Sequence, residues 1–208
     1  MMVHVGLANI GSDKVIERAE KAWTQARQMQ LSVSIAPHQR RPVRRLDEGI
    51  EDYCISMRRA AGRTAMVEVN VSCPNTHVGE PFTATPEALD RLFTALDKID
   101  RPQPTLVKMP LNKPWGEYKE LLDVLAEHNV QGCPRQSAEG PHRPRDSARL
   151  GGRPVRRPVH NASTELIRKV YKSMATGSLS PAWWRLYPRA SLCEDSFRLQ
   201  LGHVHQFR

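Results

Sequence analysis

The chain has 208 residues, 39% of them hydrophobic, and a net charge of +9. That length allows one domain with a buried core, yet it is shorter than the roughly 250 residues typical of a complete eight-stranded α/β barrel. No run of about 18 apolar residues predicts a membrane-spanning helix, and the N-terminal MMVHVGLANIGSDK lacks the basic and apolar parts of a secretory signal. The four cysteines (Cys54, Cys73, Cys133 and Cys193) form no CxxC pair. They argue against a disulfide scaffold or a metal site and favour a cytoplasmic location.

The basic charge is concentrated in three segments, 37–46, 133–161 and 174–208, which carry net charges of +4, +5 and +2. The rest of the chain is slightly acidic, and nine of the 16 prolines lie in these same segments. A basic chain usually indicates a nucleic-acid or anionic partner. Here the basic segments have no helical or strand periodicity, and 133–161 contains no Phe, Trp or Tyr. We therefore expect no nucleic-acid partner.

Outside these segments, helices and strands are predicted to alternate. Ser12 can cap a helix with an apolar face, and a short buried strand is predicted at 31–36. A second helix follows and can end at Gly62. The next strand alternates valines with Glu68 and Asn70. The apolar residues that define these elements are Val15, Ile16, Ala19, Trp23 and Ala26 in the first helix, Ile50, Tyr53, Cys54 and Met57 in the second, and Val67, Val69 and Val71 in the strand.

The following part of the chain continues this pattern. Thr85, Pro86 and Glu87 supply a cap, a proline at the first helical position and an acid in the first turn. A strand is predicted at 105–109, a helix that stops near Gly132 follows it, and Ser163 can cap a last helix. The apolar residues of these helices are Leu89, Leu92, Phe93 and Leu96; Tyr118, Leu121, Leu122 and Leu125; and Leu166, Ile167, Val170 and Tyr171. Such alternation indicates right-handed βα units around a parallel sheet.

Polar residues that could bind a ligand or take part in catalysis lie at the end of one predicted strand and within another. In parallel α/β folds the site lies where the strands end. One strand runs into the sequence NVSCPNT (70–76), and another contains Lys108 among apolar residues. An unpaired buried lysine is costly, so an acceptor is expected close to Lys108. The chain contains no GxGxxG and no GxxxxGKS/T, so the common dinucleotide and P-loop sites lack their phosphate loops.

Several of these sequences together resemble one enzyme family. MVEVNVSCPNTHVGEPF, followed by TLVKMPL, is similar to the dihydroorotate dehydrogenases. The leading VGLANIG and the later STELIRKVY match the same family in the same order. The similarity covers most of 3–132 and then 163–173. NVSCPN is a fairly specific motif, whereas VKMP alone would be weak.

The resemblance implies a fold, a cofactor and a reaction. Members of the family are flavin mononucleotide (FMN) enzymes with a (β/α)8 TIM barrel, and they oxidise dihydroorotate to orotate in pyrimidine biosynthesis. A base removes the proton at C5 of the substrate, and a hydride passes from C6 to N5 of the flavin. We therefore expect an α/β fold: an incomplete (β/α)8 TIM barrel with parallel strands and irregular Arg/Pro-rich segments at 37–46, 133–161 and 174–208.

The resemblance also assigns roles to individual residues. Cys73 lies at the position of the catalytic base. Asn9, Asn70 and Asn75 match asparagines that bind the orotate ring, and Asn70 also lies near the flavin. Lys108 matches a lysine beside the pyrimidine edge of the flavin, where a positive charge stabilises the reduced anionic form. Asparagine suits a planar substrate because its amide both donates and accepts hydrogen bonds.

Each of these residues also has a structural interpretation. Cys73 can be an inert buried thiol, Asn70 and Asn75 can satisfy a turn, and Lys108 can extend from a strand end. Other residues are predicted to be structural only. Tyr53, Cys54 and Met57 are assigned to the core, Trp23 and Trp115 to packing, and His128, close to a helix end, to capping rather than catalysis.

Two segments depart from the family pattern. The family has a further asparagine-bearing strand and glycine-rich flavin loops where this chain has 133–161 and 174–208. A reading frame shifted by one base allows glycine-rich sequence in both, although only a Gly-Gly in place of Trp183-Trp184 is forced by the genetic code. We interpret 1–132 as βα units of a partial flavin-binding barrel with the catalytic loop, 162–173 as a barrel helix, and the other two segments as out-of-frame. FMN binding is then expected to be weak or absent, since phosphate-loop N–H groups provide much of a flavin's affinity.

Several functional alternatives stay open. The chain can be an inactive remnant, a basic nucleic-acid or anion-binding protein, or a related flavin barrel that acts on another pyrimidine. A homodimer is also open. The electron acceptor is undecided, because a cysteine at 73 resembles the branch that uses fumarate or NAD, whereas Asn75-Thr76 resembles the quinone branch.

Overall fold

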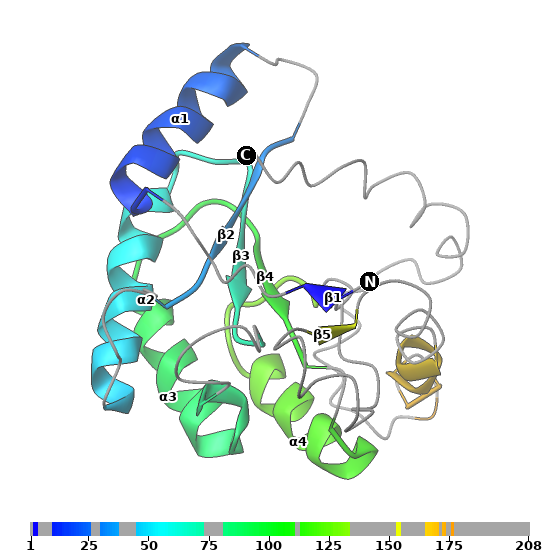
Figure 1. Ribbon diagram of the computed structural model, residues 1–208. Helices are drawn as coiled ribbons and strands as arrows, with labels where there is room; N and C mark the ends of the chain where they lie inside the picture. The colour runs from blue at the N-terminus through cyan, green and yellow to red at the C-terminus, as the bar shows by residue number, and fades with distance from the viewer. Residues whose placement is uncertain are drawn as a thin grey trace.

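In the computed structural model, the described part of the chain forms a three-stranded parallel sheet with helices along one of its faces (Figure 1). The strands β2 (Ser32–Ile35), β3 (Met66–Asn70) and β4 (Thr105–Lys108) lie in that order across the sheet. A separate antiparallel pair joins β1 (Met2–Val3) to β5 (Arg153–Pro154). The described residues are 2–3, 10–25, 30–37, 45–72, 81–110, 113–133, 153–154, 165–170, 172–173 and 176.

Each strand of the parallel sheet is joined to the next by a helix, which gives the βα repeat that the sequence predicts. Figure 1 shows the helices following one another along the outer side of the sheet. The register places Val33 opposite Val67, and Val67 opposite Thr105. The helices are α1 (Ser12–Gln25) before β2, α2 (Leu46–Ala60) between β2 and β3, η1 (Pro81–Thr83) and α3 (Pro86–Asp97) between β3 and β4, and α4 (Trp115–Ala126) after β4.

The two faces of the sheet differ in polarity. Successive side chains of a strand point to opposite faces, and Val67, Val69 and Val107 are fully buried in one cluster with the apolar stripe of α3. The alternate positions on β3 and β4 therefore belong to the other face. Those positions are Glu68, Asn70, Leu106 and Lys108. The helix-covered face is thus the hydrophobic core, and the opposite face carries the polar residues.

Two predicted helix ends are confirmed in atomic detail. Thr85 is the N-cap of α3, and its Oγ1 accepts a hydrogen bond from the backbone N–H of Ala88 at 3.2 Å. Gly62 follows α2 with φ +71, a left-handed conformation that glycine adopts without the strain of a side chain. The caps and the apolar stripes therefore act together to define these helices.

The predicted end of α4 is wrong. The helix ends at Ala126 rather than near Gly132. Gly132 instead forms a parallel bridge with Leu106 of β4, and its carbonyl accepts from the N–H of Val107 at 2.9 Å. The chain has thus already entered the next strand position of the barrel at Gly132, because sheet pairing rather than local helix propensity decides this stretch.

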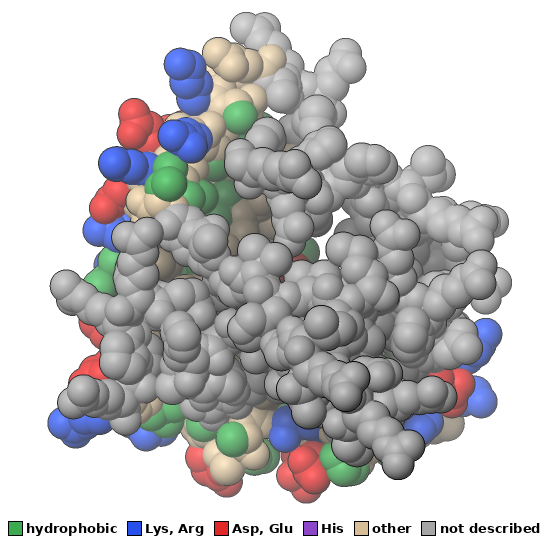
Figure 2. Space-filling model, viewed as in Figure 1, with side chains coloured by type: hydrophobic (Ala, Val, Ile, Leu, Met, Phe, Trp, Pro, Cys, Tyr) green, Lys and Arg blue, Asp and Glu red, His purple; other side chains and the backbone are tan. Residues whose placement is uncertain are grey.

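Polar side chains hold α1 against the C-terminal end of α2. Ser12 is the first residue inside α1 rather than the residue that precedes it, so the predicted cap is corrected, and its hydroxyl accepts a 2.6 Å hydrogen bond from Arg59. Arg59 also pairs with Asp13 at 2.6 Å, and Arg63 pairs with Glu20 at 2.6 Å. In Figure 2, basic and acidic side chains lie interspersed over the described surface at the upper left, where Figure 1 places α1.

The segments expected to be irregular contain some regular structure. Leu46 begins α2, and Arg153–Pro154 forms β5, so the expected irregularity of 37–46 and 133–161 is corrected at these points. Residues 165–170 and 172–173 are helical, as predicted. Leu166 and Val170 pack against the core, whereas Ile167 is 44% exposed. Ala26, Ser163 and Tyr171 of the predicted helices lie outside the residues whose side chains the structure describes.

Candidate active site at the carboxyl ends of β3 and β4

Two of the predicted site residues lie side by side at the ends of neighbouring strands. Asn70 is the last residue of β3, Lys108 is the last residue of β4, and the two are direct partners in the parallel register. Neighbouring strands are about 4.8 Å apart, so their side chains share one short stretch of the polar face. Asn70 is 6% exposed, and Lys108 is half-buried.

The side chain of Asn70 is only partly satisfied by the protein. Its Oδ1 accepts a long 3.4 Å hydrogen bond from the backbone N–H of Ser72, and its backbone carbonyl accepts a 2.7 Å hydrogen bond from the hydroxyl of Tyr53. Its amide Nδ2 has two hydrogens to donate. Neither of them has a hydrogen-bond partner within the described residues. A buried amide that donates to none of the described residues fits a ligand acceptor, because buried polar groups are normally hydrogen-bonded.

The acceptor expected beside Lys108 is not found among the described side chains. Glu68 lies on the same face of β3, two residues before Asn70. Its Oε1 accepts a hydrogen bond from the hydroxyl of Ser34 at 2.8 Å. The described part of the chain therefore offers no carboxylate within ion-pair distance of the Lys108 ammonium. A half-buried cation with no counter-ion among the described residues, next to a buried amide donor, fits a planar or anionic ligand rich in acceptors.

The chain on either side of 73–80 is buried and well packed. Ser72 is fully buried, and Phe82 of η1 is 1% exposed. The rings of Phe82 and Tyr53 meet edge to face, with centroids 5.3 Å apart and planes at 85°. Cys73 and Asn75 belong to the segment 73–80, which is outside the described residues. Asn9 is also outside the described residues. Their roles therefore stay predictions.

The two cysteines that the structure describes are poor nucleophiles. Burial raises the pKa of the Cys54 thiol, and the same effect raises the pKa of Cys133 to about 12. Both thiols are therefore protonated near neutral pH. Within the described ranges, no group of three or more His, Cys, Asp or Glu side chains could hold a metal ion. The same residues include no helix that is both long and apolar enough to cross a bilayer.

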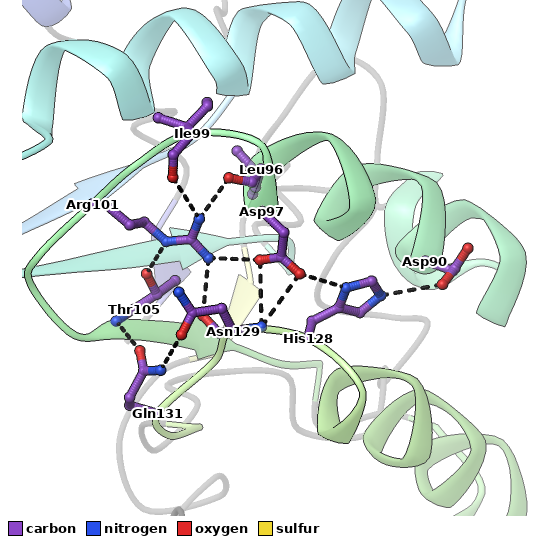
Figure 3. A network of polar contacts seen from close by, with 9 residues as sticks. All are labelled: Asp90, Leu96, Asp97, Ile99, Arg101, Thr105, His128, Asn129 and Gln131. Carbon is purple, nitrogen blue, oxygen red and sulfur yellow. Dashed lines mark hydrogen bonds and ion pairs between the residues drawn. The ribbon is translucent and has the colours of Figure 1, made fainter.

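The opposite end of the sheet carries a dense polar network that the sequence analysis missed (Figure 3). Its centre is Arg101, whose side chain is 1% exposed. The guanidinium donates to Thr105 Oγ1 at 2.8 Å, to Asp97 Oδ1 at 2.8 Å and to the backbone carbonyl of Asn129 at 2.9 Å. It also donates to the carbonyl of Leu96, at the C-terminal end of α3. Arg101 thus joins the end of α3, the start of β4 and the turn after α4.

His128 belongs to this network rather than to a helix cap. Its Nδ1 lies 2.8 Å from Asp97 Oδ2, and its Nε2 lies 3.2 Å from Asp90 Oδ1. The C-cap of α4 is Glu127. The predicted capping role is therefore corrected: the imidazole links the turn after α4 to two carboxylates of α3, as Figure 3 shows.

Comparisons with known proteins point to one family. A family model described as dihydroorotate dehydrogenase matches residues 1–177. The dihydroorotate dehydrogenase (quinone) of Vibrio parahaemolyticus is 26% identical over 185 residues, which cover 82% of this chain and 52% of that protein. The protein of the same name from Escherichia coli O1:K1 / APEC is 28% identical over the same shares.

Solved structures show the same fold. The crystal structure of DHODH from Eimeria tenella in complex with ferulenol superposes with a TM-score of 0.69 at 19% identity, covering 86% of this chain and 54% of that one. This chain spans about half the length of the relatives it matches. Its parallel βα units are accordingly an incomplete (β/α)8 TIM barrel. Because the family match extends over most of the sequence, the chain belongs to the dihydroorotate dehydrogenase family.

Proposed function

We propose that this protein is an oxidoreductase that oxidises dihydroorotate to orotate with FMN, as a step of pyrimidine biosynthesis. The observation that carries the proposal is the register pair Asn70 and Lys108 at the carboxyl ends of β3 and β4. Within the described residues, the Asn70 amide donors and the Lys108 ammonium have no protein partner. Dihydroorotate has ring carbonyls and a carboxylate, and the flavin has a pyrimidine edge of carbonyl acceptors, so both match these donors.

The proposal gives each of the two residues a distinct task. FMN, when bound, supplies the acceptor for the hydride. Lys108 places a positive charge at the pyrimidine edge of the cofactor site, where it favours the reduced anionic form. Asn70 donates from its amide to the substrate ring and stays neutral throughout. Both residues lie on strands rather than loops, which holds their donors in a fixed geometry.

Three further residues complete the proposed site. Cys73 is assigned as the base that removes the C5 proton, and this requires a thiol pKa brought toward neutrality. Asn9 and Asn75 are assigned to the substrate ring. Support for these roles comes from the sequence motif and from the buried positions of Asn70 and Ser72, which directly precede Cys73.

The names of the relatives favour a quinone as the electron acceptor. The Vibrio and Escherichia proteins are both described as quinone enzymes. We propose the same acceptor here, with Cys73 in the position of the base that is serine in most of that branch. Assays with a soluble ubiquinone analogue, fumarate and NAD, each at equal concentration, distinguish the branches. Faster reoxidation by fumarate or NAD than by the quinone would overturn this assignment.

The substrate and cofactor are tested directly on the purified chain. Calorimetry with FMN and with orotate measures binding, and the absorbance of orotate reports turnover of dihydroorotate against dihydrouracil. We expect turnover of dihydroorotate to exceed that of dihydrouracil, and Lys108→Met to weaken FMN binding. The matched control is Arg58→Met, which removes an equally flexible cation from the exposed surface of α2. Preference for dihydrouracil would assign the protein to another flavin enzyme.

The out-of-frame interpretation of 133–161 and 174–208 calls for a fresh reading of the coding DNA across codons 125–208. The family match runs through the first of these segments and ends at 177. If single-base changes restore glycine-rich loops, the corrected protein should bind FMN tightly and the chain as given weakly. If the bases stand and neither FMN nor orotate binds at millimolar concentration, the chain is an inactive remnant and the proposed activity fails.

A further inference from the structure

Tyr53 is a buried residue of α2 whose hydroxyl reaches the carboxyl end of β3. Its side chain is among the largest that the fold buries completely, with 1% of the residue exposed. Its hydroxyl donates a 2.7 Å hydrogen bond to the backbone carbonyl of Asn70, 17 residues further along the chain. Buried tyrosine hydroxyls usually find a partner, but here the partner is the residue that carries the amide of the candidate site.

The ring of Tyr53 is itself held in place. Phe82 packs against it edge to face at 5.3 Å. Phe82 belongs to η1, the first described element after 73–80, whereas Asn70 ends β3 just before that segment. One side chain of α2 therefore contacts both the strand end and the element that follows.

Within the described residues, two contacts engage the oxygens of Asn70, and none engages its amide donors. The hydroxyl of Tyr53 occupies its main-chain carbonyl, and the N–H of Ser72 reaches its Oδ1 at 3.4 Å. That second bond is at the long end of the range and would not hold the side chain alone. The strong bond to the carbonyl fixes the peptide from which the side chain projects, and so limits the directions that Nδ2 can take.

We propose that Tyr53 is a positioning residue for the site at the ends of β3 and β4. It acts through the main chain of Asn70 and holds the Asn70 amide ready to donate to a bound pyrimidine ring. This inference rests on the proposed function for the identity of the ligand, but the coupling between Tyr53 and Asn70 can be measured without any ligand. A purely structural tyrosine would affect stability and leave the Asn70 amide unchanged.

The first arm of the test uses Tyr53→Phe, which keeps the ring and its packing against Phe82 and removes only the hydroxyl. NMR of the purified chain follows the two Nδ2–H signals of Asn70 and the hydrogen exchange of the Ser72 amide. We expect the Asn70 pair to move and the Ser72 amide to exchange about two- to twelvefold faster, the range for one lost hydrogen bond. The control Tyr118→Phe makes the same change on α4, where the ring stacks on Trp115.

The second arm measures the affinity for orotate and FMN by calorimetry. Tyr53→Phe should weaken orotate binding in the parent chain, and it should not weaken further the residual binding of an Asn70→Ala variant, because the hydroxyl then has no amide to position. If the parent chain binds neither probe, the proposed function fails while the NMR arm still decides the coupling. If Asn70 and Ser72 respond no more to Tyr53→Phe than to Tyr118→Phe, the positioning role is wrong even where binding is observed.

Discussion

The two ends of the parallel sheet use their polar residues differently. At the amino ends of the strands, Arg101 donates from all three of its nitrogens to main-chain and side-chain acceptors. At the carboxyl ends, the described residues provide no partner for the Nδ2 of Asn70 or the ammonium of Lys108. Both ends contain buried or half-buried polar groups, but among the described residues only the amino end provides partners for all of the donors named here.

This difference matches a division of labour in parallel α/β barrels. Catalytic groups lie at the carboxyl ends of the strands, and residues at the amino ends serve stability. Polar groups that hydrogen-bond one another stabilise the fold. A buried donor without a protein partner lowers the free energy of unfolding, but it can bind a ligand. Substitutions at the amino ends should therefore lower the stability of the fold, whereas substitutions at the carboxyl ends should lower the affinity for the ligand. The predictions below test this contrast.

The largest expected effect is at the amino end, with Arg101→Met. The substitution removes a buried cation and leaves the carbonyl of Asn129 without its donor. Asp97 also loses a donor, but it keeps the contact with His128 and the N–H of Asn129. Hydrogen bonds to a charged group contribute about 1.5–3 kcal/mol each to the free energy of unfolding, and several are lost at once, so this variant should lose more stability than the others below. Urea denaturation followed by circular dichroism measures it. The free energy of unfolding of Arg101→Lys should lie between those of the parent and Arg101→Met, because an ammonium cannot reproduce the planar arrangement of donors of a guanidinium.

The control for Arg101 is Arg58→Met. Arg58 pairs with Glu51 at 3.0 Å, but its side chain is 55% exposed, so solvent replaces the lost contact. The free energy of unfolding of Arg58→Met should equal that of the parent within the error of the measurement. If both variants unfold at the same urea concentration as the parent, the network in Figure 3 contributes nothing and the contrast between the two ends disappears.

A smaller loss is expected for Gln103→Ala. The buried amide of Gln103 accepts from the N–H of Gly62 at 2.8 Å and donates to the carbonyl of Ala60 at 2.7 Å, so it satisfies the C-terminal end of α2. In the variant the N–H of Gly62 loses this partner and the carbonyl of Ala60 keeps only the N–H of Arg63 at 3.0 Å, at a cost of about 1–3 kcal/mol. Thermal unfolding measures the change, with Gln25→Ala on the exposed end of α1 as the control. Equal melting temperatures for the two variants would argue against this capping role.

At the carboxyl end, Asn70→Leu should leave stability nearly unchanged and remove ligand binding. Leucine has a similar volume, and the amide it replaces makes only one long hydrogen bond with the described residues. The free energy of unfolding should change by less than about 1 kcal/mol, while orotate binding measured by calorimetry is lost. A large destabilisation without a change in affinity would assign Asn70 to the fold rather than to the site.

Much of the fold could be predicted because it depends on local patterns. Apolar residues at helical spacing predicted α2, α3 and α4, and alternating valines predicted β3. The end of α4 could not be predicted, since the pairing of Gly132 with Leu106 is a contact between segments far apart in the sequence. Burial of Arg101 was equally hidden: it stands in a loop sequence, RPQPT, and arginine is normally exposed. Its acceptors are main-chain carbonyls and the side chains of Asp97 and Thr105, which only the folded chain brings together.

The candidate site was predictable in part. Asn70 and Lys108 were identified from motif resemblance, and the structure pairs them in register. The core position of Tyr53 was also predicted from helical spacing and is confirmed. Its hydroxyl bond to Asn70 was not, because spacing gives the buried face of a helix and carries no information about which strand carbonyl that face meets.

The smallest expected effect concerns the contact between α1 and α2, which depends on pH. The hydrogen bond from Arg63 lowers the pKa of Glu20 below its ordinary value of 4.5. The folded state therefore binds the proton less readily than the unfolded state, so the pair stabilises the fold above pH 4.5 and loses this contribution as the pH falls further. Glu20→Gln should be slightly less stable than the parent at neutral pH, and the difference should shrink in acid. Urea unfolding of both proteins between about pH 3 and 7 measures it, with the exposed Glu120→Gln on α4 as the control. A difference that stays constant or grows in acid would show that α1 is held by its apolar face and by Arg59 alone, without a contribution from Glu20.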